Sequence, residues 1–97
     1  MGTQIADLRR KVESGDYELT GHAKEEMEQD GFSIADVKSA ILTGKIVRLQ
    51  RHGGRTKYVV EGWANGRRWL NRRSLRAVCR LTAFGRLRII TVFVVRS

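Results

Sequence analysis

The chain of 97 residues has no proline, a single cysteine, two histidines and few aromatic side chains. The single Cys79 excludes an intrachain disulfide, and one Cys with two distant His residues does not match the ligand spacing of zinc sites. No segment approaches the roughly 20 apolar residues of a membrane span, and the first residues lack the apolar region of a signal peptide. We therefore expect a cytoplasmic protein with no metal, no cofactor and no membrane partner, in which Cys79 is a small core residue.

Acidic residues are scarce in the second half of the chain. Residues 1–44 hold nine of the ten Asp and Glu, whereas residues 45–97 hold only Glu61 against fourteen Lys and Arg, twelve of them Arg. The net charge of +9 attracts phosphate polymers before any specific contact forms. Because Arg pairs bidentately with phosphate and stacks on bases, the composition favours RNA or DNA as the partner over a membrane surface.

Residues 1–97 are expected to form a single domain, because 41% hydrophobic residues are enough for one modest core. The helical part is residues 1–44, where apolar residues recur at helical spacing behind N-cap signals. The predicted helices cover residues 4–14, Thr20 to near Gly31, and Ser33 to Gly44. The last of these begins with a capping box between Ser33 and Asp36. Residues 17–19 are interpreted as a short extended link.

The pattern changes to that of β-strands in residues 45–97. Residues 46–50 and 56–61 flank the Gly53-Gly54 turn signal, which predicts a hairpin. Residues 77–81 and 87–95 flank a second turn at Gly85, and the last strand is apolar on both faces and is expected to be central. Residues 67–75 fit neither period and are left open as strand, turn or basic loop. The predicted fold is α+β, with two or three N-terminal helices packed on a C-terminal antiparallel sheet of about four strands.

His22 is the first candidate for chemistry. It lies in the first turn of the predicted second helix, where the helix dipole favours the neutral imidazole that can act as a base. The alternative is a structural role, in which His22 packs under the sheet or caps the helix end. His52, beside the hairpin turn, is interpreted as an exposed residue.

A cluster of Arg residues interleaved with Trp is the strongest signal for a binding surface. It comprises Arg67, Arg68, Trp69, Arg72, Arg73 and Arg76, with Trp63 nearby. Such a cluster combines phosphate neutralisation with rings on which unpaired bases stack. The alternative is a solvated charged edge that prevents aggregation of the sheet, with the Trp side chains in the core.

A second group of cations lies on the predicted strands. Arg80, Arg86 and Arg88, with Lys57 and Tyr58, could gather on one face of the sheet. Together with His22, the residues Lys57, Tyr58 and Arg80 are the catalytic candidates, and Arg86 and Arg88 join the nucleic-acid-binding set. This inventory suits RNA cleavage without a metal, which needs a base, an acid and cations around the phosphorane. Strand residues can equally alternate outward for solubility, so no individual role follows from spacing.

Four stretches of sequence resemble a known family. They are the Leu-Thr-x-His-Ala start at residues 19–23, the Asp-Val pair at residues 36–37 with its later Ile-x-x-Gly, the Tyr-Val-Val strand within residues 57–62, and the Ile-Ile-Thr-Val ending at residues 89–92. In this combination they resemble the small bacterial domain-of-unknown-function family 4258 over most of the chain. The match departs from the family pattern at Glu26 and Asp30, where members usually have Arg, and at residues 69–75, which look like an insertion.

The layout is also similar to that of MqsR-type toxins and, more distantly, RelE/ParE-like ribonuclease toxins. This resemblance implies an RNA-directed toxin or an inactive relative, paired with a small antitoxin that has a Cys-x-x-Cys zinc module and a helix-turn-helix. Only His22 matches a motif residue of the family. The expected function is a toxin-like RNA-binding protein, as a metal-free endoribonuclease of a toxin–antitoxin pair or, alternatively, a non-catalytic nucleic-acid- or protein-binding module.

Overall fold

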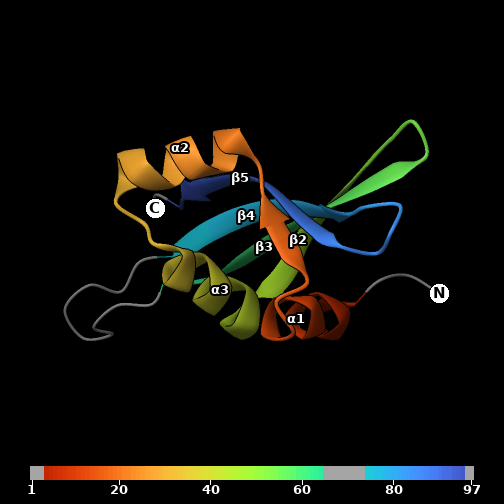
Figure 1. Ribbon diagram of the computed structural model, residues 1–97, viewed down its shortest axis with the longest axis horizontal. Coiled ribbons are helices and arrows are strands. Elements are labelled where there is room, and N and C mark those ends of the chain that lie inside the picture. The colour runs from red at the N-terminus through yellow and green to blue at the C-terminus, as the bar shows by residue number, and fades with distance from the viewer. Residues whose placement is uncertain (1–3, 65–73, 96–97) are drawn as a thin grey trace.

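The computed structural model describes residues 4–64 and 74–95, which form three helices packed on one mixed, mostly antiparallel sheet (Figure 1). The elements are α1 (Ile5–Glu13), β1 (Tyr17–Leu19), α2 (Gly21–Asp30), α3 (Ile34–Thr43), β2 (Lys45–His52), β3 (Arg55–Trp63), β4 (Ser74–Leu81) and β5 (Leu87–Val94). The strand order within the sheet is β1-β5-β4-β3-β2. The predicted α+β class is therefore confirmed.

Local capping explains where the helices begin and end. The Thr20 hydroxyl accepts a hydrogen bond from the Ala23 backbone N–H at 3.1 Å at the start of α2. This helix ends at Gly31, whose φ of 73° is left-handed and favours glycine. At the start of α3, Ser33 and Asp36 form the reciprocal capping box that the sequence predicted.

The sheet has one strand more than expected, because residues 17–19 form β1 rather than a link. They pair in parallel with β5, with Tyr17 opposite Leu87 and Leu19 opposite Ile89. β5 therefore lies between β1 and β4, so it is an interior strand, although β4 is the middle one of the five. The parallel pair is possible because α2 and the elements that follow it lie between the two strands in the sequence.

The helices bury alternate residues of the sheet to form the core. α2 lies along β5, and α3 packs on β3 and β4 (Figure 1). The larger side chains with no exposed surface include Leu8, Ile41, Leu75, Leu87 and Ile89. Cys79 belongs to this core, as predicted, and its burial raises the pKa of the thiol to about 12. Within the described residues, no helix is long and apolar enough to cross a bilayer.

α3 and β3 approach each other most closely at Gly62. A Cβ atom on Gly62 would overlap the carbonyl oxygen of Ala40 and lie 2.7 Å from the Ala40 carbonyl carbon. Only glycine fits here without a backbone shift. This contact fixes the distance between α3 and the strand that begins with Arg55 and carries Lys57.

Candidate nucleic-acid interface

A row of polar residues crosses the sheet on the face opposite the core. Glu18 of β1 pairs in register with Arg88 of β5, and Arg88 pairs in register with Arg80 of β4. Lys57 of β3 is opposite Gln50 of β2. Because the neighbouring pair joins Tyr58 to Cys79, strand alternation places Lys57 beside Arg80 on this face. The row therefore runs Glu18, Arg88, Arg80, Lys57, Gln50 across all five strands.

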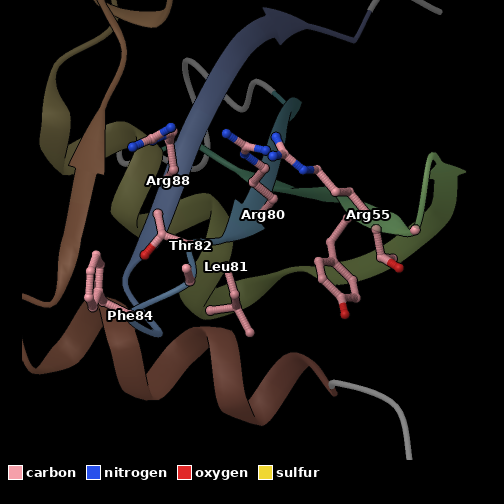
Figure 2. Close-up of a pocket in the computed structure, with 10 residues that line it drawn as sticks. Arg55, Arg80, Leu81, Thr82, Phe84 and Arg88 are labelled. Carbon is pink, nitrogen blue, oxygen red and sulfur yellow. The ribbon is translucent and has the colours of Figure 1, made fainter.

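Two adjoining hollows lie at the end of the sheet where β3 begins and β4 ends. The larger, of about 560 Å³, lies between the β2–β3 hairpin and the β4–β5 turn (Figure 2). The smaller, of about 390 Å³, is lined mainly by polar residues, with Lys57 and His52 among them. Three arginines from three strands line both hollows: Arg55, Arg80 and Arg88. We call the two together the cationic hollow.

The arginines of the cationic hollow differ in their partners. Arg80 Nε is buried and has no hydrogen-bond partner within residues 4–64 and 74–95. Arg55 and Lys57 are exposed, and their side chains likewise form no hydrogen bond or ion pair in that part of the chain. Figure 2 shows the side chains of Arg55 and Arg80 pointing toward one another. An anion between them would satisfy the buried donor and reduce the like-charge repulsion.

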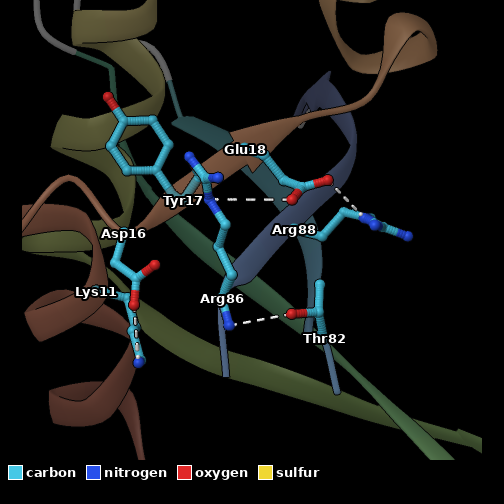
Figure 3. A network of polar contacts seen from close by, with 7 residues as sticks. All are labelled: Lys11, Asp16, Tyr17, Glu18, Thr82, Arg86 and Arg88. Carbon is cyan, nitrogen blue, oxygen red and sulfur yellow. Dashed lines mark hydrogen bonds and ion pairs between the residues drawn. The ribbon is translucent and has the colours of Figure 1, made fainter. Parts of the chain in front are cut away.

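Glu18 neutralises part of the positive charge at the β1 side of the hollow. Its carboxylate accepts a hydrogen bond from Arg88 Nε at 2.9 Å and lies 3.9 Å from Arg86 Nε (Figure 3). Arg86 also donates to the Tyr17 carbonyl oxygen at 2.9 Å, which ties the start of β5 to β1. Both of these predicted nucleic-acid-binding arginines therefore have an acidic partner in the structure.

Arg76, a third residue of the predicted binding cluster, is also paired. Its Nε donates to Glu61 Oε1 at 2.8 Å on the same face of the sheet, one row from the end of β3. Trp63 lies nearby at the end of β3 and is exposed rather than buried in the core. The other members of the cluster, Arg67, Arg68, Trp69, Arg72 and Arg73, lie outside the described residues.

The structure does not bring the four catalytic candidates together. Lys57 and Arg80 share the open face, but Tyr58 is 9% exposed and packs in the core on the other face, reaching only the wall of the larger hollow. His22 is 67% exposed on α2 and lines neither hollow, and its Nε2 lies 3.4 Å from Glu26 Oε1.

Glu26 has a structural role at the edge of β5. Beyond the short β1, no other described strand pairs with this edge, and Glu26 accepts hydrogen bonds there from the Val92 backbone N–H at 3.0 Å and from the Thr91 hydroxyl. The carboxylate thus replaces the missing strand as an acceptor. An acidic residue at position 26 therefore has a structural function, because its carboxylate accepts the hydrogen bonds of β5. His22 lies beside this structural carboxylate.

Three of the lining residues that were not among the sequence candidates bear on the chemistry of the hollow. His52 and Arg55 face each other across the β2–β3 hairpin, and Phe84 lies on the β4–β5 turn. The Gly53-Gly54 signal predicted the hairpin, so pairing its two flanking residues would have found His52 and Arg55. No group of three or more His, Cys, Asp or Glu that could hold a metal ion occurs in residues 4–64 and 74–95.

Comparison with known proteins gives a family but no activity. A family model described as a domain of unknown function, DUF4258, matches residues 19–94, which reach from the end of β1 to the end of β5. No curated protein and no solved structure matches the chain. The matched span contains all the residues of the cationic hollow.

Proposed function

The chain belongs to the DUF4258 family, whose function is unknown, and we propose that it binds RNA in the cationic hollow and cleaves it there without a metal ion. The observation that carries this proposal is the buried Arg80 Nε, which has no hydrogen-bond partner among the described residues, beside Arg55, whose side chain is likewise unpaired among them. Folding leaves such a group unsatisfied at a cost of roughly 1–3 kcal/mol. A phosphate supplies both the acceptor and the negative charge that this group lacks.

RNA is favoured over DNA because the hollow holds two titratable side chains beside the arginines. His52 and Lys57 both line its smaller part. A neutral imidazole can take a proton near pH 7, and an ammonium group can give one. Such a pair can act on RNA, whose 2′-hydroxyl is an internal nucleophile that DNA lacks.

The proposed reaction is transfer of the phosphoryl group to the 2′-oxygen. His52 accepts the proton of the 2′-hydroxyl, and the 2′-oxygen bonds to the adjacent phosphorus. The bond from phosphorus to the 5′-oxygen breaks, and Lys57 gives the leaving oxygen its proton. Arg55 and Arg80 stabilise the charge of the phosphorane. The products are a 2′,3′-cyclic phosphate and a 5′-hydroxyl end.

The test measures binding and cleavage of a labelled single-stranded RNA by EDTA-treated protein at two salt concentrations. Arg80→Ala is expected to weaken binding and abolish cleavage. The matched control is Arg51→Ala, because Arg51 is an exposed β2 arginine that lines neither hollow. It should retain cleavage and lose at most about one unit of the salt slope.

Two further samples separate binding from catalysis. His52→Ala should bind RNA as the wild type does and lose cleavage, and an RNA with a 2′-deoxy residue at the cleaved position should bind without being cut. Binding without cleavage by the wild type would refute the catalytic step and leave a non-catalytic binding module. Absence of RNA binding at low salt would refute the whole proposal. The antitoxin partner that the resemblance implies stays a prediction.

A further inference from the structure

Phe84 is the most exposed large apolar residue in the part of the chain that the structure describes. It is 98% exposed on the turn between β4 and β5, whereas the other exposed large apolar residues reach at most 50%. A phenyl ring that is almost fully exposed gains almost nothing from burial in the folded chain. Packing in the core therefore does not account for a phenylalanine at this position, which suggests a role in binding.

The turn that carries Phe84 is held by several hydrogen bonds. Thr82 donates its backbone N–H to the Arg86 carbonyl oxygen at 2.8 Å, and Gly85 donates to the Thr82 carbonyl oxygen at 2.9 Å. The Thr82 hydroxyl accepts from the Arg86 N–H at 3.1 Å (Figure 3). Gly85 has a φ of 82°, which permits this tight turn. The backbone thus presents the ring from a defined position.

The Phe84 ring lies at the cationic hollow, where we propose that an RNA phosphate binds. Phe84 lines the same 560 Å³ hollow as Arg80 and Arg88. Resting on the RNA binding proposed above, we propose that Phe84 is a stacking platform for an unpaired base of the strand whose phosphate lies in the cationic hollow. The ligand class that this implies is single-stranded RNA, since the bases of a duplex are already stacked and cannot lie on an external ring.

The surroundings of Phe84 favour a nucleobase over an apolar protein surface. Its neighbours in the larger hollow include three arginines, and the only apolar residues on its turn are Phe84 itself and the small Ala83. A protein-docking site of this kind would need a wider apolar patch to exclude water. A single ring beside cations is the arrangement that single-strand binders use, in which stacking holds the base and the cations hold the backbone.

The experiment measures dissociation constants for a short 2′-O-methyl oligoadenylate, which cannot be cleaved through its 2′-oxygen. Wild type is compared with Phe84→Ala, Phe84→Leu and Phe84→Trp. Stacking on one base predicts that Phe84→Ala weakens binding about 5- to 150-fold. Phe84→Trp should retain the affinity of the wild type, and Phe84→Leu should not restore it, because leucine keeps the apolar surface without a π-face.

A second oligonucleotide isolates the base from the backbone. On an abasic oligonucleotide of the same length, wild type and Phe84→Ala should bind equally, because their phosphate contacts are the same. The indole fluorescence that Phe84→Trp adds to that of the wild type should be quenched by the oligoadenylate and not by its duplex with a complementary strand. Because Phe84 is almost fully exposed, none of these variants is expected to alter folding, which thermal unfolding checks.

The outcomes separate this inference from the function on which it rests. If Arg80→Ala loses RNA binding and Phe84→Ala does not, the cationic hollow stands and the stacking platform is refuted. If Phe84→Ala weakens binding of the abasic and the intact oligonucleotide equally, the ring acts on something other than a base, and the inference also fails. If the wild type binds no RNA at low salt, both the inference and the proposed function fall.

Discussion

Replacing Arg80 by Met should raise the stability of the protein while it removes RNA binding. Among the described residues of the sheet, Arg80 is the one whose side-chain Nε is buried and has no hydrogen-bond partner. Methionine has nearly the length of the Arg stem and so keeps most of the packing that the stem provides. What the substitution deletes is the guanidinium group, with its unmet hydrogen bond and its repulsion by Arg55 and Arg88.

The magnitude follows from the burial of the group. One unsatisfied buried donor costs about 1–3 kcal/mol, and the low end applies here because the Arg80 side chain as a whole is only partly buried. We therefore expect a gain of about 1 kcal/mol in the free energy of unfolding. For a domain of this size such a gain raises Tm by roughly 4–8 °C.

Thermal and urea unfolding of purified Arg80→Met measure this gain, with Arg76→Met as the matched control. Arg76 lies on the same strand and face, but its Nε is bonded to Glu61 at 2.8 Å. Its loss leaves Glu61 unpaired and should lower stability by a few tenths to about 1 kcal/mol. A loss of stability for Arg80→Met, or equal shifts for both variants, would show that Arg80 serves the fold and would remove the reason for a phosphate site.

Two other predictions concern the core. Gly62→Ala should lower stability by at least about 2 kcal/mol in urea unfolding, because its Cβ overlaps the Ala40 carbonyl oxygen; Gly21→Ala, which meets nothing within 4 Å, should change it little, and equal effects would contradict the close approach. The stability advantage of wild type over Cys79→Ala should fall by about 1 kcal/mol between about pH 9 and 10. The unfolded thiol ionises from its ordinary pKa of 9.0, whereas burial raises the folded pKa to about 12, so a flat difference across this range would refute the burial effect.

The parts of the fold that the sequence predicted well depend on neighbouring residues. Caps at Thr20 and Ser33 and the left-handed Gly31 act within a few positions of the helix that they delimit. The hairpin depends likewise on Gly53 and Gly54, both of which have positive φ. Such local signals do not depend on the rest of the chain, so they can be read before the tertiary structure is known.

β1 could not be predicted in the same way. Three residues are too short to show alternation, and their partner strand starts seventy positions later with Leu87 opposite Tyr17. The role of Glu26 was hidden for the same reason, since its partners Thr91 and Val92 belong to that distant strand. The pairing partner of a short strand is a tertiary property of the chain.

Part of the candidate site could be predicted from the sequence. Lys57 and Tyr58 are consecutive in a predicted strand, so alternation alone places their side chains on opposite faces, and a cluster with both on one face was geometrically excluded. The juxtaposition of Lys57 with Arg80 and Arg88 needed the register of three strands. The exposure of Phe84 needed the turn itself, because an isolated aromatic residue in a sequence is usually buried.

The distribution of carboxylates explains why the cationic hollow lies where it does. The open face of the described sheet has two acids, Glu18 at the β1 side and Glu61 near the end of β3, and each pairs with the arginines next to it in register. No carboxylate lines the hollow between them, where Arg55 and Arg80 stay uncompensated within the described chain. A chain that used arginine only for solubility would gain nothing from burying the Nε of one of them. Among the described residues, Arg55 and Arg80 place uncompensated charge in a hollow that is open to solvent, and this is the position at which we propose that a phosphate binds.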